Sequence, residues 1–176
     1  KDIPIRELVL NTEELKMLEG YKFLTAKPLL VVFNIGEEDL PQVTSLEAEW
    51  QSQFHKPQFR LISLCAKLEA ELSQLSDEEA KGFRSAMGVA EPALARVVGT
   101  SYELLGLITF LTVGPDEVRA WTIRKGTPAL KAAGKIHSDM ERGFIRAEVV
   151  SYSDLIKTGG LAEARKQGLL RAEGKT

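Results

Sequence analysis

The sequence has few of the residues that build disulfides and metal sites. It contains one cysteine, Cys65, and two histidines, His55 and His137, in 176 residues. A lone cysteine cannot form an internal disulfide, so nothing indicates an oxidising compartment. A zinc cage needs clustered cysteine and histidine at short spacing, and these three residues are far apart in the sequence. We therefore expect no metal site built from them.

Long hydrophobic runs are also missing. The longest strictly apolar run covers residues 29–33, whereas a membrane helix needs about 20 apolar residues. The first residues show no basic segment followed by an apolar one, so we expect no secretory signal and no membrane partner. With 44% hydrophobic and 27% charged residues, the composition is typical of a globular chain with one or two domains.

Two catalytic motifs are absent from the chain. The sequence has no G-x-x-x-x-G-K-[ST] phosphate loop and no G-x-S-x-G nucleophile elbow. The first loop cradles nucleotide phosphates in one large class of nucleotide hydrolases. We therefore predict that these 176 residues alone carry no catalytic residue and do not hydrolyse a nucleotide. For His137, a polar role at a helix end is favoured over catalysis.

Charge is divided unevenly along the chain. Residues 1–106 hold 11 lysines and arginines against 17 acidic residues, whereas residues 107–176 hold 12 against eight. The change of sign favours two modules. The basic module has the charge to face an anionic partner such as RNA. A solvated surface of ordinary composition is the alternative.

Residues 1–106 have the alternating pattern of an α/β sheet. Two short apolar segments, 29–33 and 60–64, are typical of parallel strands, and we expect the first to be buried on both faces. Helices are predicted around them, with Thr12 and Ser76 as N-caps and Glu79 completing a capping box. The last helix carries Leu94, Val97, Val98 and Leu104 on its expected apolar side. The predicted helices cover residues 12–24, 43–54, 66–72, the segment from 77, and 92–105.

The pattern changes after Gly106. Residues 107–113 and 118–123 are predicted to form a hairpin around the turn at 114–116. A helix over 129–136 follows, with Thr127 as N-cap and Pro128 as its first residue, and then a strand over 144–150. Short helical pieces are expected around Ser153 and 159–160. Hairpin, helix and strand in this order are typical of the opening of a β-grasp fold.

Polar residues follow both strands of the first module. Asn34-Ile35-Gly36-Glu37 comes after one strand, and Ser63-Leu64-Cys65-Ala66-Lys67 overlaps the end of the other. Ligands of open α/β sheets bind beyond the carboxyl ends of the strands. An asparagine amide has both a donor and an acceptor for a purine, a backbone N–H at Ala66 or Lys67 can add a contact, and the lysine stem can cover the base. The alternative is an ordinary turn, since asparagine and glycine are common there.

Several longer motifs resemble the C-terminal half of the Obg-like ATPase family. They are LTAKP at 24–28 leading into NIGE at 34–37, AKLEAE at 66–71, EVRAWTI at 117–123, AAGKIHSDMERGFIRAE at 132–148 and RAEGK at 171–175. The resemblance covers essentially the whole chain, and its last two motifs are the most specific. It implies a chain that is shorter than the family's proteins at both ends.

The resemblance implies a fold for each part. Residues 1–20 are expected to be the end of a helical arm, and residues 21–106 the second half of a Ras-like P-loop domain. Residues 107–176 are expected to be a TGS domain, a ubiquitin-like β-grasp module without its final strands. Incomplete sheets leave unpaired edges. We expect a three-stranded remnant in the TGS part and an open edge in the half P-loop sheet.

The resemblance also implies a function. Family members bind and hydrolyse ATP, less strictly GTP, with Mg²⁺, and associate with ribosomes in the cytoplasm. Guanine-specific relatives end the base motif in aspartate, which accepts from guanine N–H groups that adenine lacks, so Glu37 favours ATP here. Without a phosphate loop this chain should bind ATP weakly or not at all. The base-contacting positions implied are Asn34, Ile35, Glu37, Cys65, Ala66 and Lys67.

The TGS part gives a second hypothesis, an RNA- or ribosome-binding module with no nucleotide activity. Its surface candidates are Arg119, Arg124, Lys125, Lys135 and Arg142, with Lys131 and Arg146 beside them. Scattered solubilising charges are the alternative. Trp121 and Phe144, both in expected strands, are assigned to the core rather than to base stacking. Reading of a DNA sequence is not expected.

Overall fold

The structure is a computed structural model that describes residues 2–54, 56–89, 91–114 and 116–175, so His55 and Pro115 lie outside the described residues. The chain has a mixed α/β fold and divides into two compact units, residues 1–106 and 107–176. No helix among the described residues is long and apolar enough to cross a membrane. Each unit is described on its own below.

The first unit is built on two parallel strands. β1 (Leu29–Asn34) pairs with β2 (Phe59–Leu64) in a register that runs from Leu29 opposite Phe59 to Asn34 opposite Leu64. A 3₁₀ segment, η3 (Glu37–Gln42), and helix α2 (Val43–Gln53) connect them. Both predicted strands are confirmed. Each is a short, mostly apolar run, which is the pattern that predicted it.

Burial differs between the two strands. Leu61 and Ile62 of β2 are buried, but Val32 and Phe33 of β1 are 43% and 38% exposed. The prediction that residues 29–33 are buried on both faces is therefore wrong. Among the described residues β1 pairs with β2 alone, and Phe33 packs against Trp50 of α2 with ring centroids 4.6 Å apart. An apolar strand is buried on both faces only where elements cover both faces.

The first helix is shorter than predicted. α1 covers Thr12–Glu19, and its N-cap is Asn11, which forms a capping box with Glu14; the assignment of Thr12 as N-cap is wrong. Residues beyond Gly20 leave the helix because Lys22 has a positive φ of 53°, which a continuing α-helix does not permit. Two 3₁₀ segments, η1 (Ile5–Glu7) and η2 (Leu24–Ala26), flank it.

Three further helices follow β2. They are α3 (Ala66–Leu72), α4 (Asp77–Ala86) and α5 (Ala93–Leu104). The capping box of Ser76 and Glu79 is confirmed. The buried cluster of this region consists of Cys65, Leu68, Leu72 and Ala80 with Leu40 beside it.

The prediction of which residues form the apolar side of α5 is partly wrong. Leu94 and Val98 are exposed, whereas Val97 and Leu104 are half-buried. The helix buries Ala93 instead and directs Arg96 towards β2. The spacing of apolar residues alone does not predict which face of a helix packs against its neighbours when a polar side chain of that helix binds one of them.

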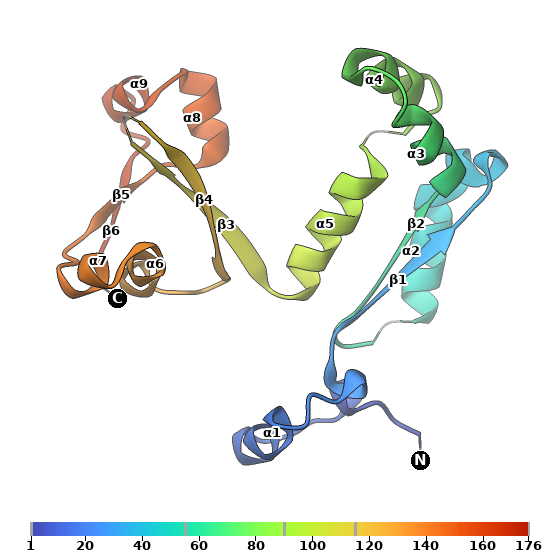
Figure 1. Ribbon diagram of the computed structural model, residues 1–176, viewed down its shortest axis with the longest axis horizontal. Coiled ribbons are helices and arrows are strands. Elements are labelled where there is room, and N and C mark those ends of the chain that lie inside the picture. Colours follow the sequence, from blue (N-terminus) through green and yellow to red (C-terminus); the bar gives the residue numbers. More distant parts are fainter. Residues whose placement is uncertain (1, 55, 90, 115, 176) are drawn as a thin grey trace. The chain divides into compact units, whose positions relative to one another are not determined.

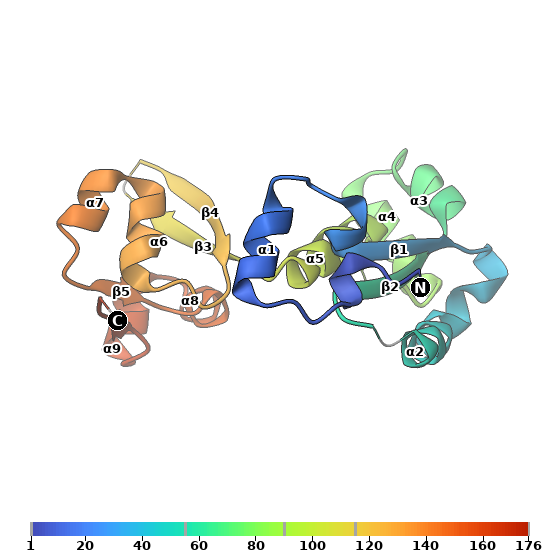
Figure 2. The same cartoon turned by 90° about the horizontal axis from the view of Figure 1, so that it is seen from below.

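Helices α2 and α5 both lie against β2 (Figure 2). One side chain from each helix meets the edge of β2 that faces away from β1. Leu29 and Ile35 donate to the carbonyls of Gln58 and Leu64. Because backbone groups alternate in direction along a strand, the N–H and C=O of Ser63 then point away from β1. Glu47 accepts from the Ser63 N–H, and Arg96 donates to the Ser63 carbonyl at 2.9 Å.

The same two side chains also bind each other. Arg96 donates to both carboxylate oxygens of Glu47, at 2.7 and 2.8 Å. Each partner is only about a quarter exposed or less. We call these two residues the edge clamp, because together they satisfy the backbone groups that a neighbouring strand would otherwise bind.

The second unit opens with the predicted hairpin. β3 (Leu107–Val113) pairs antiparallel with β4 (Val118–Arg124), from Leu107 opposite Arg124 to Val113 opposite Val118. Helix α6 (Ala129–Ile136) lies against β4, and α7 (Ser138–Arg142) follows it (Figure 2). Pro128 is the N-cap, so the assignment of Thr127 is wrong by one position; the Thr127 hydroxyl donates to the Arg124 carbonyl at 2.6 Å.

The last strands form a separate pair. β5 (Ala147–Val149) pairs antiparallel with β6 (Arg171–Glu173), and α8 (Tyr152–Thr158) and α9 (Leu161–Lys166) lie between them in the chain. The predicted strand over 144–150 is therefore too long, and Phe144 is buried outside it. The expectation of a three-stranded remnant is wrong for the described residues, which hold two two-stranded sheets in this unit.

Candidate functional site

The polar residues at the ends of β1 and β2 line one hollow of about 330 Å³. Its walls come from the segment after β1 and from the start of α3. Five of the six predicted base-contacting positions line it. The sixth, Ala66, does not line the hollow, but its backbone N–H donates to Asn34, which does. The lining residues are Asn34, Ile35, Gly36, Glu37, Glu38, Cys65 and Lys67.

Asn34 is fixed by the first turn of α3. Its Oδ1 accepts a hydrogen bond from the backbone N–H of Ala66 at 3.0 Å. The next residue, Ile35, continues the ladder by donating to the Leu64 carbonyl at 2.9 Å. No group of the described residues accepts from the Asn34 amide NH₂. The side chain is thus held by its oxygen, and its two N–H donors remain for a ligand.

Lys67 is paired across the hollow with Glu37. Its Nζ lies 3.0 Å from Glu37 Oε1 and 3.9 Å from Glu71 Oε1. The hydrogen bond and the negative charge of Glu37 raise the pKa of Lys67 above its usual value, with a smaller contribution from Glu71. The lysine is therefore charged at neutral pH, and one oxygen of Glu37 is committed to it.

Gly36 leaves room for a second carboxylate beside the same hollow. A Cβ at this position would lie 2.3–2.5 Å from the carboxylate of Glu38. The φ of Gly36 is −73°, so the requirement for glycine here is one of space and not of a left-handed backbone. Any larger residue at position 36 would displace Glu38.

Cys65 lies between the hollow and the core. It is 4% exposed and packs with Leu68, Leu72 and Ala80. Its side chain makes no capping hydrogen bond to α3, although it occupies the N-cap position. The residue therefore contributes a wall rather than a reactive thiol. Across the described ranges, no group of three or more His, Cys, Asp or Glu side chains is placed to hold a metal ion.

The second histidine takes the polar role at a helix end. His137 is the N-cap of α7, where its Nδ1 accepts from the Asp139 N–H at 3.2 Å. Its side chain is largely exposed and lies near the Asp139 carboxylate. Such an arrangement stabilises a helix start and gives no nucleophile or base a partner.

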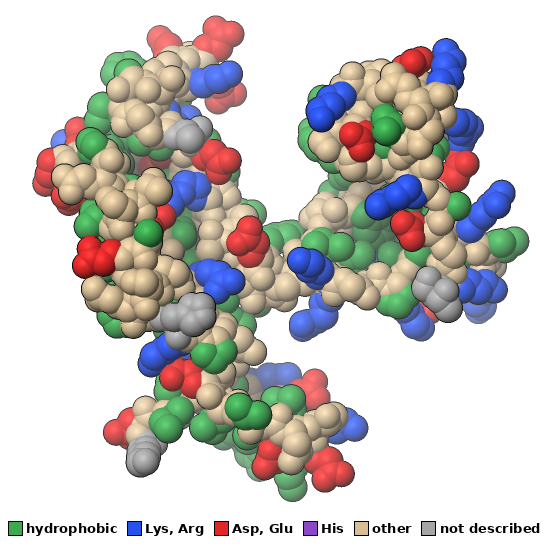
Figure 3. All heavy atoms as spheres, turned by 180° about the vertical axis from the view of Figure 1, so that it is seen from behind, with side chains coloured by type: hydrophobic (Ala, Val, Ile, Leu, Met, Phe, Trp, Pro, Cys, Tyr) green, Lys and Arg blue, Asp and Glu red, His purple; other side chains and the backbone are tan. Residues whose placement is uncertain are grey.

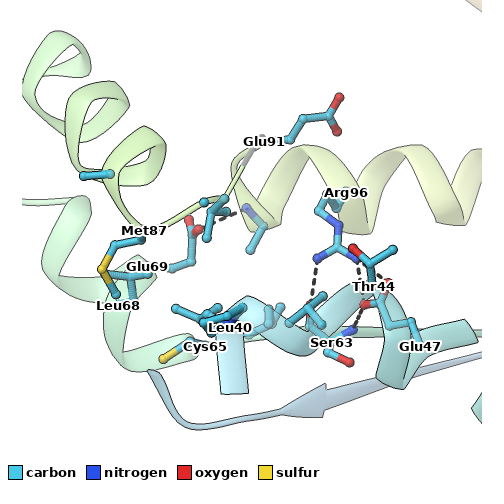
Figure 4. A pocket seen from close by; sticks show the side chains of 17 residues that line it. Leu40, Thr44, Glu47, Ser63, Cys65, Leu68, Glu69, Met87, Glu91 and Arg96 are labelled. Carbon is cyan, nitrogen blue, oxygen red and sulfur yellow. Dashed lines mark hydrogen bonds and ion pairs between the residues drawn. The ribbon is translucent and has the colours of Figure 1, made fainter. Parts of the chain in front are cut away.

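A second, larger hollow of about 590 Å³ lies beside the edge clamp in the first unit (Figure 4). Sequence reasoning missed it, because its residues come from three separate stretches of the chain, 40–47, 63–69 and 86–96. Three of its charged groups have partners: Glu47 binds Arg96, and Glu69 accepts from the Ala93 N–H at 3.2 Å and lies 3.7 Å from Arg84. A fourth, Glu91, forms no ion pair with a described residue. Ser63 Oγ is buried here without a hydrogen-bond partner among the described residues.

The basic candidates of the second unit fall into two groups. Arg142 pairs with Asp139, and Lys131 pairs with Glu141. The exposed side chains of Arg124, Lys125 and Lys135 form no ion pair with any described residue. Figure 3 shows lysine and arginine side chains projecting around this unit with acidic ones among them.

Trp121 is part of a small stack on the hairpin. The Arg119 guanidinium lies 4.4 Å from the centroid of the Trp121 ring, and Trp121 Nε1 donates to Thr112 Oγ1 at 2.9 Å. Trp121 is half-buried, and one of its faces carries the arginine. A guanidinium on an indole is a favourable cation–π contact.

Comparison with known proteins gives consistent matches. The YchF-GTPase_C family model, described as "Protein of unknown function (DUF933)", matches residues 107–176. The chain is 41% identical over 174 residues to the ribosome-binding ATPase YchF of Bacillus subtilis, covering 98% of this chain and 48% of that protein. It is 42% identical over 171 residues to the ribosome-binding ATPase YchF of Haemophilus ducreyi, covering 97% and 47%.

A solved structure matches over almost the same range. The Schizosaccharomyces pombe YchF GTPase aligns with a TM-score of 0.76 and 34% identity, covering 98% of this chain and 46% of that one. The fold is therefore that of the corresponding part of a YchF-type nucleotide hydrolase. Over nearly its whole length the chain is similar to part of the YchF proteins, and residues 107–176 match the YchF-GTPase_C model. It spans about half the length of the curated relatives it matches.

Proposed function

We propose that this chain supplies the base-recognition side of an adenine-nucleotide site in a ribosome-associated protein of the YchF family. The observation that carries the proposal is that Asn34 and Lys67 line one hollow beyond the carboxyl ends of two parallel strands. In this assignment residues 21–106 are the second half of a P-loop domain, residues 1–20 the end of its helical arm, and residues 107–176 a TGS domain.

The chemistry of the hollow suits a purine edge. The free Asn34 NH₂ can donate to an acceptor nitrogen of the base, and the second lone pair of its Oδ1 can accept from an exocyclic amino group. Adenine offers both groups side by side. The carboxylate at the position where guanine-binding relatives have an aspartate, Glu37, is paired with Lys67 through one of its oxygens. The proposal is therefore that ATP binds better than GTP.

The phosphates and Mg²⁺ are assigned to other residues. The chain has no phosphate loop and spans about half the length of its relatives. We therefore place phosphate binding, Mg²⁺ binding and hydrolysis in a part of the protein outside these residues. The contribution of the chain is to hold and select the base, and its own affinity for nucleotide is low.

The base proposal can be tested with the chain itself. Titration of ¹⁵N-labelled chain with AMP, GMP and ribose 5-phosphate, followed by NMR, should shift the Asn34 side-chain amide and the Ala66 N–H with AMP. Asn34→Ala should weaken AMP binding tenfold or more while costing about 1 kcal/mol of stability for the lost Ala66 hydrogen bond. The side-chain amide of Asn11, the only other asparagine, is the internal control. Tighter binding of GMP than of AMP would contradict the proposal.

A second candidate function is an RNA- or ribosome-binding module without nucleotide activity. It is favoured by the exposed, unpaired side chains of Arg124, Lys125 and Lys135, and by relatives that are named ribosome-binding. Cations without a protein partner are available to neutralise phosphates, so binding should weaken steeply as salt rises. This function is compatible with the first and places the complex in the cytoplasm.

Charge reversal separates this surface from scattered charge. The triple variant R124E/K125E/K135E should lower affinity for ribosomes at least tenfold and flatten the salt dependence, measured by co-sedimentation over a range of KCl concentrations. R142E/K131E is the matched control, since both of those side chains are already paired within the unit. Equal losses in the two variants would mean that net charge, and not this surface, determines binding.

A further inference from the structure

We propose that Glu37 is a positioning residue that holds the Lys67 side chain across the hollow and does not itself read the base. This inference rests on the proposed base site and assigns the specificity of that site to Asn34. It concerns the one carboxylate that the sequence pattern places where guanine-binding relatives have an aspartate.

The first observation is which partner Glu37 has. Its Oε1 lies 3.0 Å from Lys67 Nζ, whereas the next carboxylate, on Glu71, is 3.9 Å away. Both Glu37 and Lys67 line the hollow. A carboxylate that reads guanine needs both oxygens for the two neighbouring N–H donors of that base. Glu37 has one oxygen already bound to an ammonium group, so a guanine would have to share or break this ion pair to be read by both oxygens.

The second observation is what the pair does to Lys67. The side chain of Lys67 is 73% exposed, and an unpaired lysine of that exposure samples many rotamers. Glu37 fixes its tip on the far side of the hollow, so the methylene stem runs from α3 towards η3. A fixed stem provides an apolar surface for a flat ring at a small entropic cost.

The third observation concerns side-chain length. Glu37 is the first residue of η3 and reaches Lys67, the second residue of α3, with a side chain one methylene longer than that of aspartate. Glu38 is no substitute, because its carboxylate lies over Gly36. Shortening Glu37 should therefore release Lys67 from η3, because the acid that remains near it, Glu71, lies on α3 itself and cannot hold the lysine across the hollow.

The test is a double-mutant cycle with AMP and GMP as probes, followed by NMR titration of the chain. Glu37→Gln and Lys67→Met should each weaken AMP and GMP binding by the same factor, about two- to fivefold, which is the range for an exposed ion pair. The double variant should be no weaker than either single one. Glu37→Asp should behave like Glu37→Gln and gain no preference for GMP. Glu103→Gln, an exposed carboxylate of α5 that lines neither hollow, is the control and should change nothing.

The outcomes distinguish the role of Glu37 from the proposal that the hollow binds a base. A wild-type chain that shifts with neither AMP nor GMP overturns the base site and this inference together. A Glu37 variant that changes the ratio of AMP to GMP affinity more than threefold shows that Glu37 reads the base, and overturns this inference alone. Effects of Glu37→Gln and Lys67→Met that multiply in the double variant also overturn it, because residues acting through one contact must be coupled.

Discussion

The two hollows of the first unit differ in which of their polar groups have partners within the protein. In the larger, the charges of Glu47, Arg96 and Glu69 are all paired within the protein. In the smaller, Lys67 is paired with Glu37, and the Asn34 amide retains donors without a partner among the described residues. Size would select the larger hollow as the binding site. We favour the smaller one because it lies beyond the carboxyl ends of two parallel strands and offers free amide donors there, whereas the uncommitted groups of the larger one are Glu91 and the buried Ser63 hydroxyl.

Removing one side chain of the edge clamp should give the largest loss of stability. Glu47→Ala leaves Arg96 and the Ser63 N–H without their partner, and loss of one member of a mostly buried pair should cost about 2–3 kcal/mol of unfolding free energy. Urea unfolding would measure the loss, with Glu163→Ala in the exposed pair with Lys166 as control. If the loss of AMP binding free energy exceeds the loss of unfolding free energy, the larger hollow takes part in binding, and the smaller hollow is not the site alone.

A smaller effect is expected at the wall that both hollows share. Cys65 lines each of them and packs in the buried cluster. Cys65→Ser places a hydroxyl among Leu68, Leu72 and Ala80, and should cost about 1–3 kcal/mol, measured by urea unfolding. Cys65→Ala removes the sulfur without adding a polar group, so the serine variant should be the less stable of the two. The reverse order would mean that the thiol position is wetter than its burial indicates.

The smallest effect should come from α4, whose C-terminal end borders the larger hollow. Ser76→Ala removes an N-cap and should cost about 1 kcal/mol. Hydrogen bonds from Ser76 lower the pKa of Glu79 below its usual 4.5. The stability that this carboxylate adds is therefore present above pH 4.5 and lost as pH falls through its lowered pKa.

Hydrogen exchange of the α4 amides from pH 3 to 7 would measure both effects. Ser85→Ala, in the same helix but outside the capping box, is the matched control and should leave the pH dependence unchanged. AMP binding at neutral pH should be the same in both variants. A Ser76→Ala variant that loses AMP binding would connect the larger hollow to the ligand.

Local signals in the sequence predicted much of this structure. Residues 29–33 and 60–64 specify their strands because apolar β-rich runs stand between turn residues, and the Ser76 capping box lies within four residues. The smaller hollow could be predicted because the ends of neighbouring parallel strands meet at one edge. Boundaries were less predictable: Asn11 and Thr12 are both good caps, and only the box with Glu14 selects the first.

Tertiary pairings could not be predicted in the same way. Glu47 and Arg96 are 49 residues apart in the sequence, and neither lies in a motif that announces its partner. β6 has three residues and no apolar alternation, so only its pairing with β5 makes it a strand. The exposure of Leu94 follows from the side of α5 that Arg96 turns towards β2. Helical periodicity contains no information on that choice.

The edge clamp determines at which edge of the two-stranded sheet a further strand can pair. The Ser63 N–H and C=O are occupied by Glu47 and Arg96, while β1 has no strand on its other side among the described residues. An additional strand, from wherever it comes, can dock beside β1 but meets salt-bridged side chains beside β2. A second copy that paired with β2 at Ser63 would have to displace these two side chains, which disfavours extension of the sheet on that side.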